Sequence, residues 1–445
     1  DLMDKIEDNH TMGSVLRVAL PLIFSSFSWT LMITIDRMML AKYSIDEMNA
    51  VVAIGTLLFM FEWSISSITV TSEIFAGQFN GLKRKKKTPI ATWQMLILSA
   101  ASSLLFIPTS LFFGKYLIPE KYYIHGGDFF QIIMCFLMFG AANNAINAFF
   151  IGIKKTKIIL YNAIFGNVIN IILSYNLIFG IDGLIDPLGS KGAAIATTIA
   201  LIIQFSIIFS VFLSKKFDNE YSTRKFILDS DIFKKCLKLG IPSSIGLIAE
   251  MSGNYIMQIL ILAYLPIYVS NHNITINIYV FLTFLLNGMH KAISGLAANL
   301  IGEDRIKQID KLLASAIKLH MFSTLIIIIP TIIFGNFTAS LYTDNIDIIN
   351  NTVQTFTLLA AVFFLEGIGW IMAGAIMAGG DTKFNMLTNI IVIWIFKVVP
   401  TYLLLKNGVT AVALRLILST CSNIIYVILF YMRYKSGKWL KLRLS

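Results

Sequence analysis

Charged side chains are scarce in this sequence: only 14% of the 445 residues are Asp, Glu, Lys or Arg, whereas 56% are hydrophobic. Soluble domains carry about 25% charged residues, so this composition excludes an ordinary soluble protein. Proline and cysteine are also rare, with nine and three copies. Because the three cysteines lie far apart in the chain, both a disulfide framework and a CxxC metal site are excluded.

Motifs for enzymatic chemistry are missing as well. No GxxxxGK[ST] sequence occurs, since Gly437-Lys438 is followed by Trp439. Hydrolysis of ATP by a P-loop is therefore excluded. HExxH and GxSxG sequences are also missing, which removes two common classes of hydrolase. We expect no enzyme and no cofactor, and any transport would have to draw on an ion gradient.

Long apolar segments are what the sequence does contain. About 20 consecutive apolar residues cross a bilayer as a helix. Residues 1–13 include four acidic residues and the following apolar run is too long for a signal peptide, so no cleavable signal is expected. We predict an all-α polytopic membrane protein with twelve transmembrane helices. They are expected near residues 14–40, 50–77, 89–113, 129–152, 158–180, 192–213, 237–264, 274–300, 313–335, 352–378, 384–405 and 409–432.

The placement of basic residues orients these helices. Alternate connectors and the two ends of the chain carry 27 Lys and Arg, and the opposite connectors carry six. The positive-inside rule then puts both termini in the cytoplasm of a multi-pass cell (inner) membrane protein. Contact with anionic membrane lipids is a secondary expectation. No nucleic acid partner is expected, because the basic residues are scattered over seven connectors.

An internal repeat divides the chain. The segment Leu16-Arg-Val-Ala-Leu-Pro21 is matched by Leu237-Lys-Leu-Gly-Ile-Pro242, and Gly152 to Lys157 is matched by Ala378 to Lys383. We predict an N-lobe (residues 1–213), a cytoplasmic linker (214–236) and a C-lobe with the tail (237–445). Each half contains six helices, and an even number of spans returns the chain to the side of the membrane where it started. Both halves therefore have the same orientation in the membrane. Two lobes related by a pseudo-two-fold axis along the membrane normal are expected, with a cleft between them.

Ionisable residues inside the predicted spans are functional candidates by default, because a charge there costs at least a few kcal/mol. Three carboxylates, Asp36, Glu250 and Glu366, lie deep in their spans, toward the outer half. Structural roles are expected instead for Glu62, Glu73 and Lys291. The other members of this group are His290, Lys397 and Arg415.

Asparagines crowd the fourth and fifth predicted helices, at positions 143, 144, 147, 162, 167 and 170. They are explained either by hydrogen bonds between helices or by an oxygen cage for a cation. In the second case, Asp36, Asn170 and Thr197 would supply the hard oxygen ligands that Na⁺ needs.

Several of these elements resemble one family. They are Pro21 followed by Ile35-Asp36-Arg37, the run from Asn170 to Gly180, Gly192 to Thr197, Gly240-Ile-Pro242 with Glu250, and Glu366 with Gly374 to Thr382. Together they are similar to the multidrug and toxic compound extrusion (MATE) transporters, in particular the NorM-like branch. The resemblance runs through essentially the whole chain.

This resemblance implies two sites. Asp36, Asn170 and Thr197, with Asn176 as a weaker member, would belong to a cation or proton site in the N-lobe. Glu250 and Glu366 would form a site in the C-lobe. Three departures from the family pattern are Glu366 in place of Asp, Met377 in place of Arg, and Ser174 where some relatives have an acid. The last of these puts the number of ions bound in the N-lobe in question.

The predicted function is a cation-coupled (Na⁺ or H⁺) antiporter that exports small organic, often cationic compounds by alternating access, acting as a monomer. Aromatic faces for such substrates are expected from Trp29, Phe61, Trp63 and Trp370. A flippase for lipid-linked oligosaccharides is the alternative, although it would need more cavity Arg and Lys to hold pyrophosphate. A membrane enzyme would need a larger aqueous loop than the sequence offers. Substrate identity and the choice of ion stay open.

Overall fold

The computed structural model describes residues 12–265, 269–408 and 413–444. The start of the chain and residues 409–412, where the twelfth predicted helix begins, lie outside this part. The described residues form helices and no strand, so the all-α prediction is confirmed. In chain order the helices are α2 (Met12–Tyr43), α3 (Ile45–Thr69), α4 (Ser72–Gly81), η1 (Lys85–Lys87), α5 (Thr88–Pro108), η2 (Thr109–Phe113), α6 (Gly114–Leu117), α7 (Glu120–Phe136), α8 (Met138–Gly152), α9 (Lys157–Phe179), α10 (Gly189–Phe212), α11 (Lys215–Tyr221), α12 (Ser230–Tyr264), α13 (Val269–Gly302), α14 (Gln308–Ile333), α15 (Gly335–Ser340), α16 (Ile346–Ala378), α17 (Thr382–Ile390), η4 (Ile391–Val398), α18 (Val399–Lys406) and α19 (Ala413–Lys435).

The number of candidate membrane spans agrees with the prediction. Within the described residues, eleven helices are long and apolar enough to cross a membrane, or twelve if the bent pair α7 and α8 is one span. Several spans are longer than the sequence indicated. For example, α12 begins at Ser230 rather than near residue 237. A search for apolar residues does not include charged first turns such as that of α12, which explains why the predicted span begins later than the helix.

The predicted fourth span is broken. Its two parts, α7 and α8, meet at Leu137 with a bend of 43°. The Leu137 amide donates to the carbonyl of Met134, and the Gly140 amide donates to the carbonyl of Leu137. These three-residue hydrogen bonds replace the four-residue ladder of a regular α-helix, which accounts for the local change of direction.

The chain folds into two compact units. The N-terminal unit comprises Phe24–Ser244 and Leu444–Ser445, and the C-terminal unit comprises Asp1–Ile23 and Ile245–Arg443. The long helices α2 and α12 each contribute their first part to one unit and the remainder to the other. The lobe boundaries at residues 213 and 237, and the two-fold relation, stay predictions.

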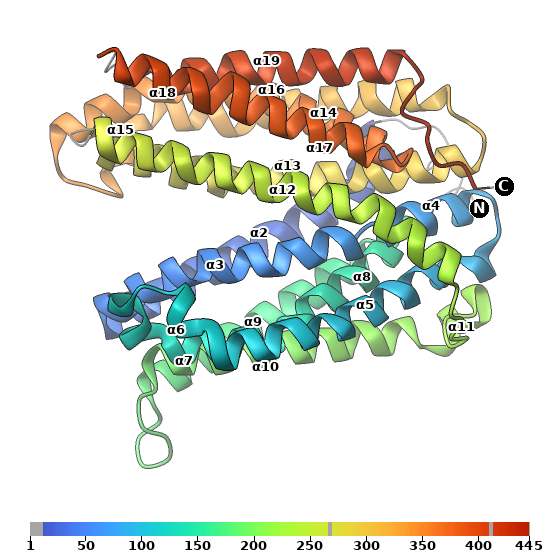
Figure 1. Cartoon of the computed structure of the whole chain (residues 1–445), viewed down its shortest axis with the longest axis horizontal. Helices are drawn as coiled ribbons and strands as arrows, with labels where there is room; N and C mark the ends of the chain where they lie inside the picture. Colours follow the sequence, from blue (N-terminus) through green and yellow to red (C-terminus); the bar gives the residue numbers. More distant parts are fainter. Residues whose placement is uncertain (1–11, 266–268, 409–412, 445) are drawn as a thin grey trace. The chain divides into compact units, whose positions relative to one another are not determined.

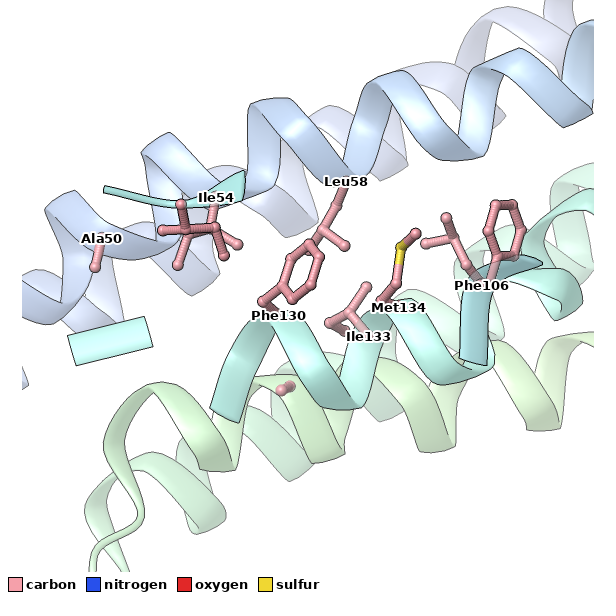
Figure 2. Packing of buried hydrophobic residues seen from close by; sticks show 10 residues of the cluster. Ala50, Ile54, Leu58, Phe106, Phe130, Ile133 and Met134 are labelled. Atoms are coloured by element: carbon pink, nitrogen blue, oxygen red, sulfur yellow. The ribbon is translucent and has the colours of Figure 1, made fainter. Parts of the chain in front are cut away.

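Packing in the N-terminal unit is dense around α3, α5 and α7. Figure 2 shows Ala50, Ile54 and Leu58 of α3 facing Phe130, Ile133 and Met134 of α7, with Phe106 of α5 at one end. The exposed fractions of these side chains range from 0% to 7%. Because lipid is as apolar as the protein interior, close packing of this kind holds membrane helices together.

Close helix contacts in the same unit depend on small residues. Helices α9 and α10 pack along each other (Figure 1). A Cβ atom built on Gly192 of α10 would lie 2.4 Å from the carbonyl oxygen of Leu177 on α9. A backbone oxygen cannot swing away as the end of a side chain can, so only glycine fits at this position.

This contact makes a stability prediction. We expect Gly192→Ala to destabilise the protein by roughly 1–3 kcal/mol, as overpacking typically does. The matched control is Gly55→Ala in α3, where an added Cβ would meet nothing within 4 Å and alanine gains up to about 1 kcal/mol of helix propensity. Thermal unfolding in detergent should show a lower Tm for Gly192→Ala only. Equal Tm values for the two variants would contradict the close approach of α9 and α10.

The C-terminal unit is built around α16, which packs against α13, α14 and α19 (Figure 1). Its contact with α14 is made by His320, whose ring stacks on Phe364 with centroids 6.0 Å apart. A Cβ atom on Gly367 would lie 2.1 Å from the Nε2 atom of His320. The imidazole ring therefore occupies the space that this glycine leaves. Glu366 directly precedes Gly367 in α16.

Candidate functional site

Asp36 of α2 lies in a polar cluster in the N-terminal unit. Its carboxylate is close enough to Asn170 and Ser174 of α9 to interact with both. The side-chain amide of Asn170 donates to the hydroxyl of Thr197 on α10, with an Nδ2 to Oγ1 distance of 3.2 Å. Asn170 and Ser174 are four residues apart, so they project from one face of α9. The structure thus brings three of the predicted residues, Asp36, Asn170 and Thr197, into one place.

Three oxygens in this cluster lack a hydrogen-bond partner among the described residues: Oδ1 of Asp36, Oδ1 of Asn170 and Oγ of Ser174. The Asn170 and Ser174 side chains are fully buried. Unpaired buried oxygens are costly unless a donor or a cation occupies the space between them. Carboxylate, amide and hydroxyl oxygens are hard ligands, so this donor set fits a small cation such as Na⁺ as well as a proton on Asp36.

Two details differ from the sequence-based picture of this site. Asn176, six residues after Asn170 on α9, donates to the carbonyl of Ile172 on its own helix at 2.8 Å. Its side chain is thus directed along α9, and among the described residues it makes no contact with Asp36. Conversely, Ser174, noted in the sequence only as a missing acid, lies beside the carboxylate.

The C-terminal unit contains a second acidic site. Glu366 of α16 accepts a hydrogen bond from the hydroxyl of Tyr279 on α13, at 2.6 Å. The side chains of Trp370 and Asn423 also lie near this carboxylate. A short hydrogen bond to a carboxylate is about twice as strong as a neutral one, so Tyr279 fixes the position of Glu366.

Glu250 of α12 belongs to the same site. Its Oε2 atom accepts a hydrogen bond from Asn389 of α17 at 3.3 Å. Glu366 and Lys397 are close enough to act on its charge, and Tyr426 of α19 lies within electrostatic range of both carboxylates. Lys397 is part of η4, a π-helical segment, and such segments often occur at functional sites. The structure therefore brings Glu250 and Glu366 together, two acids with one nearby lysine.

The predicted aromatic residues do not form one group. In the N-terminal unit, the rings of Trp29 and Phe59 are 6.1 Å apart and those of Phe59 and Trp63 are 5.4 Å apart. Phe61 instead packs edge-on against Phe106 in the core of that unit, so it serves packing there. Trp370 belongs to the C-terminal unit, where its ring meets that of His290.

Several residues of these sites could not be found from the sequence. Tyr279, Asn389 and Tyr426 have no neighbouring motif that marks them, because tyrosine and asparagine are tolerated at many positions of a membrane helix. Only the packing of α13, α17 and α19 on α16 brings them to the carboxylates. The only feature of the sequence that could have indicated these three residues is that each is a polar residue within an apolar segment.

A basic segment lies at the end of α4. Residues 83–87 and Glu220 line a surface hollow of about 350 Å³. Lys85 pairs with Glu220 at 2.5 Å, and this hydrogen-bonded ion pair holds the pKa of Glu220 below its usual range. Both side chains are more than one-third exposed, so the pair contributes little to stability. The hollow offers positive charge to anionic groups.

No group of three or more His, Cys, Asp or Glu residues that could hold a metal ion occurs in the described part of the chain. The oxygen cluster at Asp36 has a different composition, one carboxylate with amide and hydroxyl groups.

Comparison with known proteins gives consistent matches. The family model MatE matches residues 21–176 and 242–403. The chain is 24% identical over 409 residues to the multidrug resistance protein NorM of Vibrio parahaemolyticus, covering 88% of this chain and 87% of that protein. It is also 24% identical over 448 residues to the uncharacterized transporter YisQ of Bacillus subtilis, covering 96% and 95%.

Solved structures share the fold. One is described as the outward-facing conformation of a multidrug resistance MATE family transporter of the MOP superfamily. It superposes with a TM-score of 0.86 at 17% identity, over 95% of this chain and 96% of that chain. Another, MATE in the straight conformation, gives a TM-score of 0.84 at 17% identity, over 96% and 97%.

Proposed function

Since this chain belongs to the MATE family of multi-pass membrane transporters, we propose that it exports small organic, often cationic compounds in exchange for Na⁺ or H⁺. The observation that carries the proposal is the Asp36 cluster, a buried carboxylate among oxygens that lack partners. The relative NorM of Vibrio parahaemolyticus is described as a multidrug resistance protein, which supports the substrate class.

The Asp36 cluster can bind either ion. Na⁺ would be held by Asp36, Asn170 and Ser174, with Thr197 orienting the Asn170 amide through its hydroxyl. A bound Na⁺ supplies one positive charge. A proton on Asp36 has the same effect on the net charge, because it also neutralises the carboxylate. Both ions therefore change the cluster from negative to neutral inside the membrane, where charge is expensive.

Coupling then follows from linkage. If the ion and the organic compound stabilise different conformations, entry of the ion down its gradient favours the state that releases the compound outside. Alternating access is the conformational cycle that this requires. In the C-terminal unit, Glu250 and Glu366 provide a second place where a cation or proton would lower the local negative charge.

We further propose that the protein acts as a monomer in the cell membrane with both termini in the cytoplasm. The orientation is supported by the 27 basic residues on one set of connectors against six on the other. In that orientation residues 83–87 lie at the cytoplasmic surface, where their charge would contact anionic lipid headgroups.

The experiment that tests the proposed function uses the purified chain in liposomes. Efflux or uptake of ethidium is followed by fluorescence while a Na⁺ gradient and a pH gradient are imposed separately. We expect at least one gradient to drive dye movement against its own concentration, and dissipation of that gradient to stop it. If neither gradient moves the dye or another organic cation, the proposed antiport is wrong.

A further inference from the structure

Glu62 of α3 is an acidic residue that the sites above do not use. It lies near the middle of the span Ile45–Gly81, about 26 Å along the helix from Ile45 and about 28 Å from Gly81 at 1.5 Å per residue. No described residue forms a hydrogen bond or ion pair with its carboxylate. Keeping an unpaired carboxylate at this depth costs several kcal/mol, which calls for a compensating function.

The position of this carboxylate is defined by α8. A Cβ atom built on Gly140 would lie 2.6 Å from Oε1 of Glu62. The carboxylate therefore occupies the space left by this glycine, against the backbone of α8. One turn along α3, the hydroxyl of Ser66 accepts a hydrogen bond from Asn144 at 3.1 Å, so these two groups satisfy each other.

Aromatic residues lie on the same face of α3 as Glu62. Phe59, Glu62, Trp63 and Ser66 stand at spacings of three, four and seven residues, so they share one face of α3. The rings of Phe59 and Trp63 are 5.4 Å apart, and Trp29 of α2 extends the group through Phe59. The Trp29 side chain is 42% exposed, which makes this aromatic group accessible from outside the packed core.

A further acceptor lies one turn after Gly140 on α8. Asn143 is three residues after Gly140 on α8, and its Oδ1 atom is buried without a partner. Its amide nitrogen already has a partner, because it donates a hydrogen bond to Oε1 of Gln204 at 3.5 Å. The free oxygen is therefore suited to accept from an N–H group of a protonated amine.

The Glu62 carboxylate is distinct from the Asp36 cluster. Gln204 of α10 donates to Asn167 of α9, which in turn donates to Ser28 of α2, at 3.3 Å and 2.8 Å. Asn170, the amide of the Asp36 cluster, follows Asn167 by one turn. None of these hydrogen bonds involves Glu62 or Asp36, and the two carboxylates have different neighbours, Gly140 for Glu62 and Asn170 with Ser174 for Asp36, so they can bind different ligands.

From these observations we propose that Glu62, together with the aromatic group of Phe59, Trp63 and Trp29, binds the positively charged centre of an aromatic organic cation. The carboxylate supplies charge in a low-dielectric site and the rings supply cation–π faces. This assignment rests on the proposed function, since it names the group that would recognise the exported compound. It distinguishes Glu62, which binds substrate, from Asp36, which binds the coupling ion.

The test measures binding of ethidium to the purified full-length chain by fluorescence anisotropy, with the neutral planar dye Nile red as the comparison probe. We expect Glu62→Gln to raise the Kd for ethidium at least tenfold, equivalent to about 1.4 kcal/mol, and to change the Kd for Nile red less than twofold. Glu62→Asp should restore part of the ethidium affinity, because the charge returns on a shorter arm.

A second variant keeps the charge and moves it. Gly140→Ala places a methyl group 2.6 Å from Oε1 of Glu62, and the flexible carboxylate can shift away without unfolding the helix. We expect a smaller rise in the ethidium Kd, about threefold to fivefold by the affinity relation, with an unchanged Tm because the methyl group meets the end of a flexible side chain and not the backbone. Circular dichroism and Tm show whether each variant is folded.

The outcomes separate the two proposals. If the wild-type chain neither binds nor transports ethidium or another organic cation, the proposed function and this assignment both fail. If the wild-type chain binds ethidium and folded Glu62→Gln binds it equally well, only the assignment of Glu62 is overturned. The assignment is also overturned if Glu62→Gln leaves ethidium affinity intact but removes its dependence on Na⁺ or pH, because Glu62 would then be a coupling residue.

Discussion

Replacing Asp36 with asparagine is expected to abolish gradient-driven transport of ethidium. The amide keeps the size of the side chain but cannot carry a charge, so the cluster is left with neutral oxygens from Asn170, Ser174 and Thr197. Each tenfold ion gradient supplies about 1.4 kcal/mol per ion, and this driving force is lost when no ion binds. The ratio of dye concentrations across the membrane should fall from about tenfold to about one.

The measurement is dye accumulation in liposomes under an imposed Na⁺ or pH gradient. The matched control is Asp186→Asn, which makes the same chemical change in an exposed position of the connector between α9 and α10. Binding of ethidium without a gradient should survive in Asp36→Asn, because the charge of Glu62 is untouched. Undiminished accumulation in this variant would rule out Asp36 as the coupling residue.

Replacing Glu366 with glutamine is expected to have a second large effect, a drop of about 100-fold in the initial rate of transport. Two carboxylates share the site with one nearby lysine, and removal of one charge changes the affinity of the site for a cation or proton. The hydrogen bond from Tyr279, at 2.6 Å, would become a neutral one. Hydrogen bonds to charged groups contribute about 1.5–3 kcal/mol, against about 1 kcal/mol for neutral ones.

Two related variants refine this result. Tyr279→Phe keeps the charge of Glu366 and removes only its hydrogen bond, so a decrease of about tenfold is expected. Asp344→Asn serves as the control. Asp344 is exposed and precedes α16, so this substitution removes one carboxylate outside the site. The order of initial rates should be control, Tyr279→Phe, then Glu366→Gln. A Tyr279→Phe variant slower than Glu366→Gln would show that the tyrosine itself, and not the charge it positions, is required.

The membrane class and the number of spans were predictable because they depend on composition and run length. Apolar segments of about 20 residues can only be helices in a bilayer, where every backbone amide must be paired within the segment. Helix ends were less accurate. The start of α12 at Ser230 and the break at Leu137 depend on local hydrogen bonds and charged turns, which average hydropathy does not register.

The deep carboxylates were also recognisable from the sequence, because acidic residues within apolar spans are rare and costly. Their partners were not. Ser174 reaches Asp36 because α9 packs beside α2, and Tyr279 reaches Glu366 because α13 packs on α16. Contacts between distant segments depend on which helix faces meet, and one sequence does not specify them.

Some sequence-based expectations changed once side-chain directions were known. Asn176 is on the right helix for the Asp36 site, yet it bonds to Ile172 on its own helix. Phe61 belongs to the packed core rather than to the aromatic group of Trp29 and Trp63. Glu62, expected to be structural, is an unpaired carboxylate held against Gly140, on the same face of α3 as Phe59 and Trp63.

By itself the sequence determined that this protein is a helical membrane transporter and which acids deserve a functional test, and it predicts by the positive-inside rule which way the connectors face. Those properties follow from the cost of placing charge in lipid, which acts on each residue separately. Only the tertiary structure decided which oxygens surround Asp36, which tyrosine holds Glu366 and where Glu62 lies. The reason is physical: a site is a set of distances between helices, and those distances are set by the packing of glycines and side chains from segments far apart in the chain.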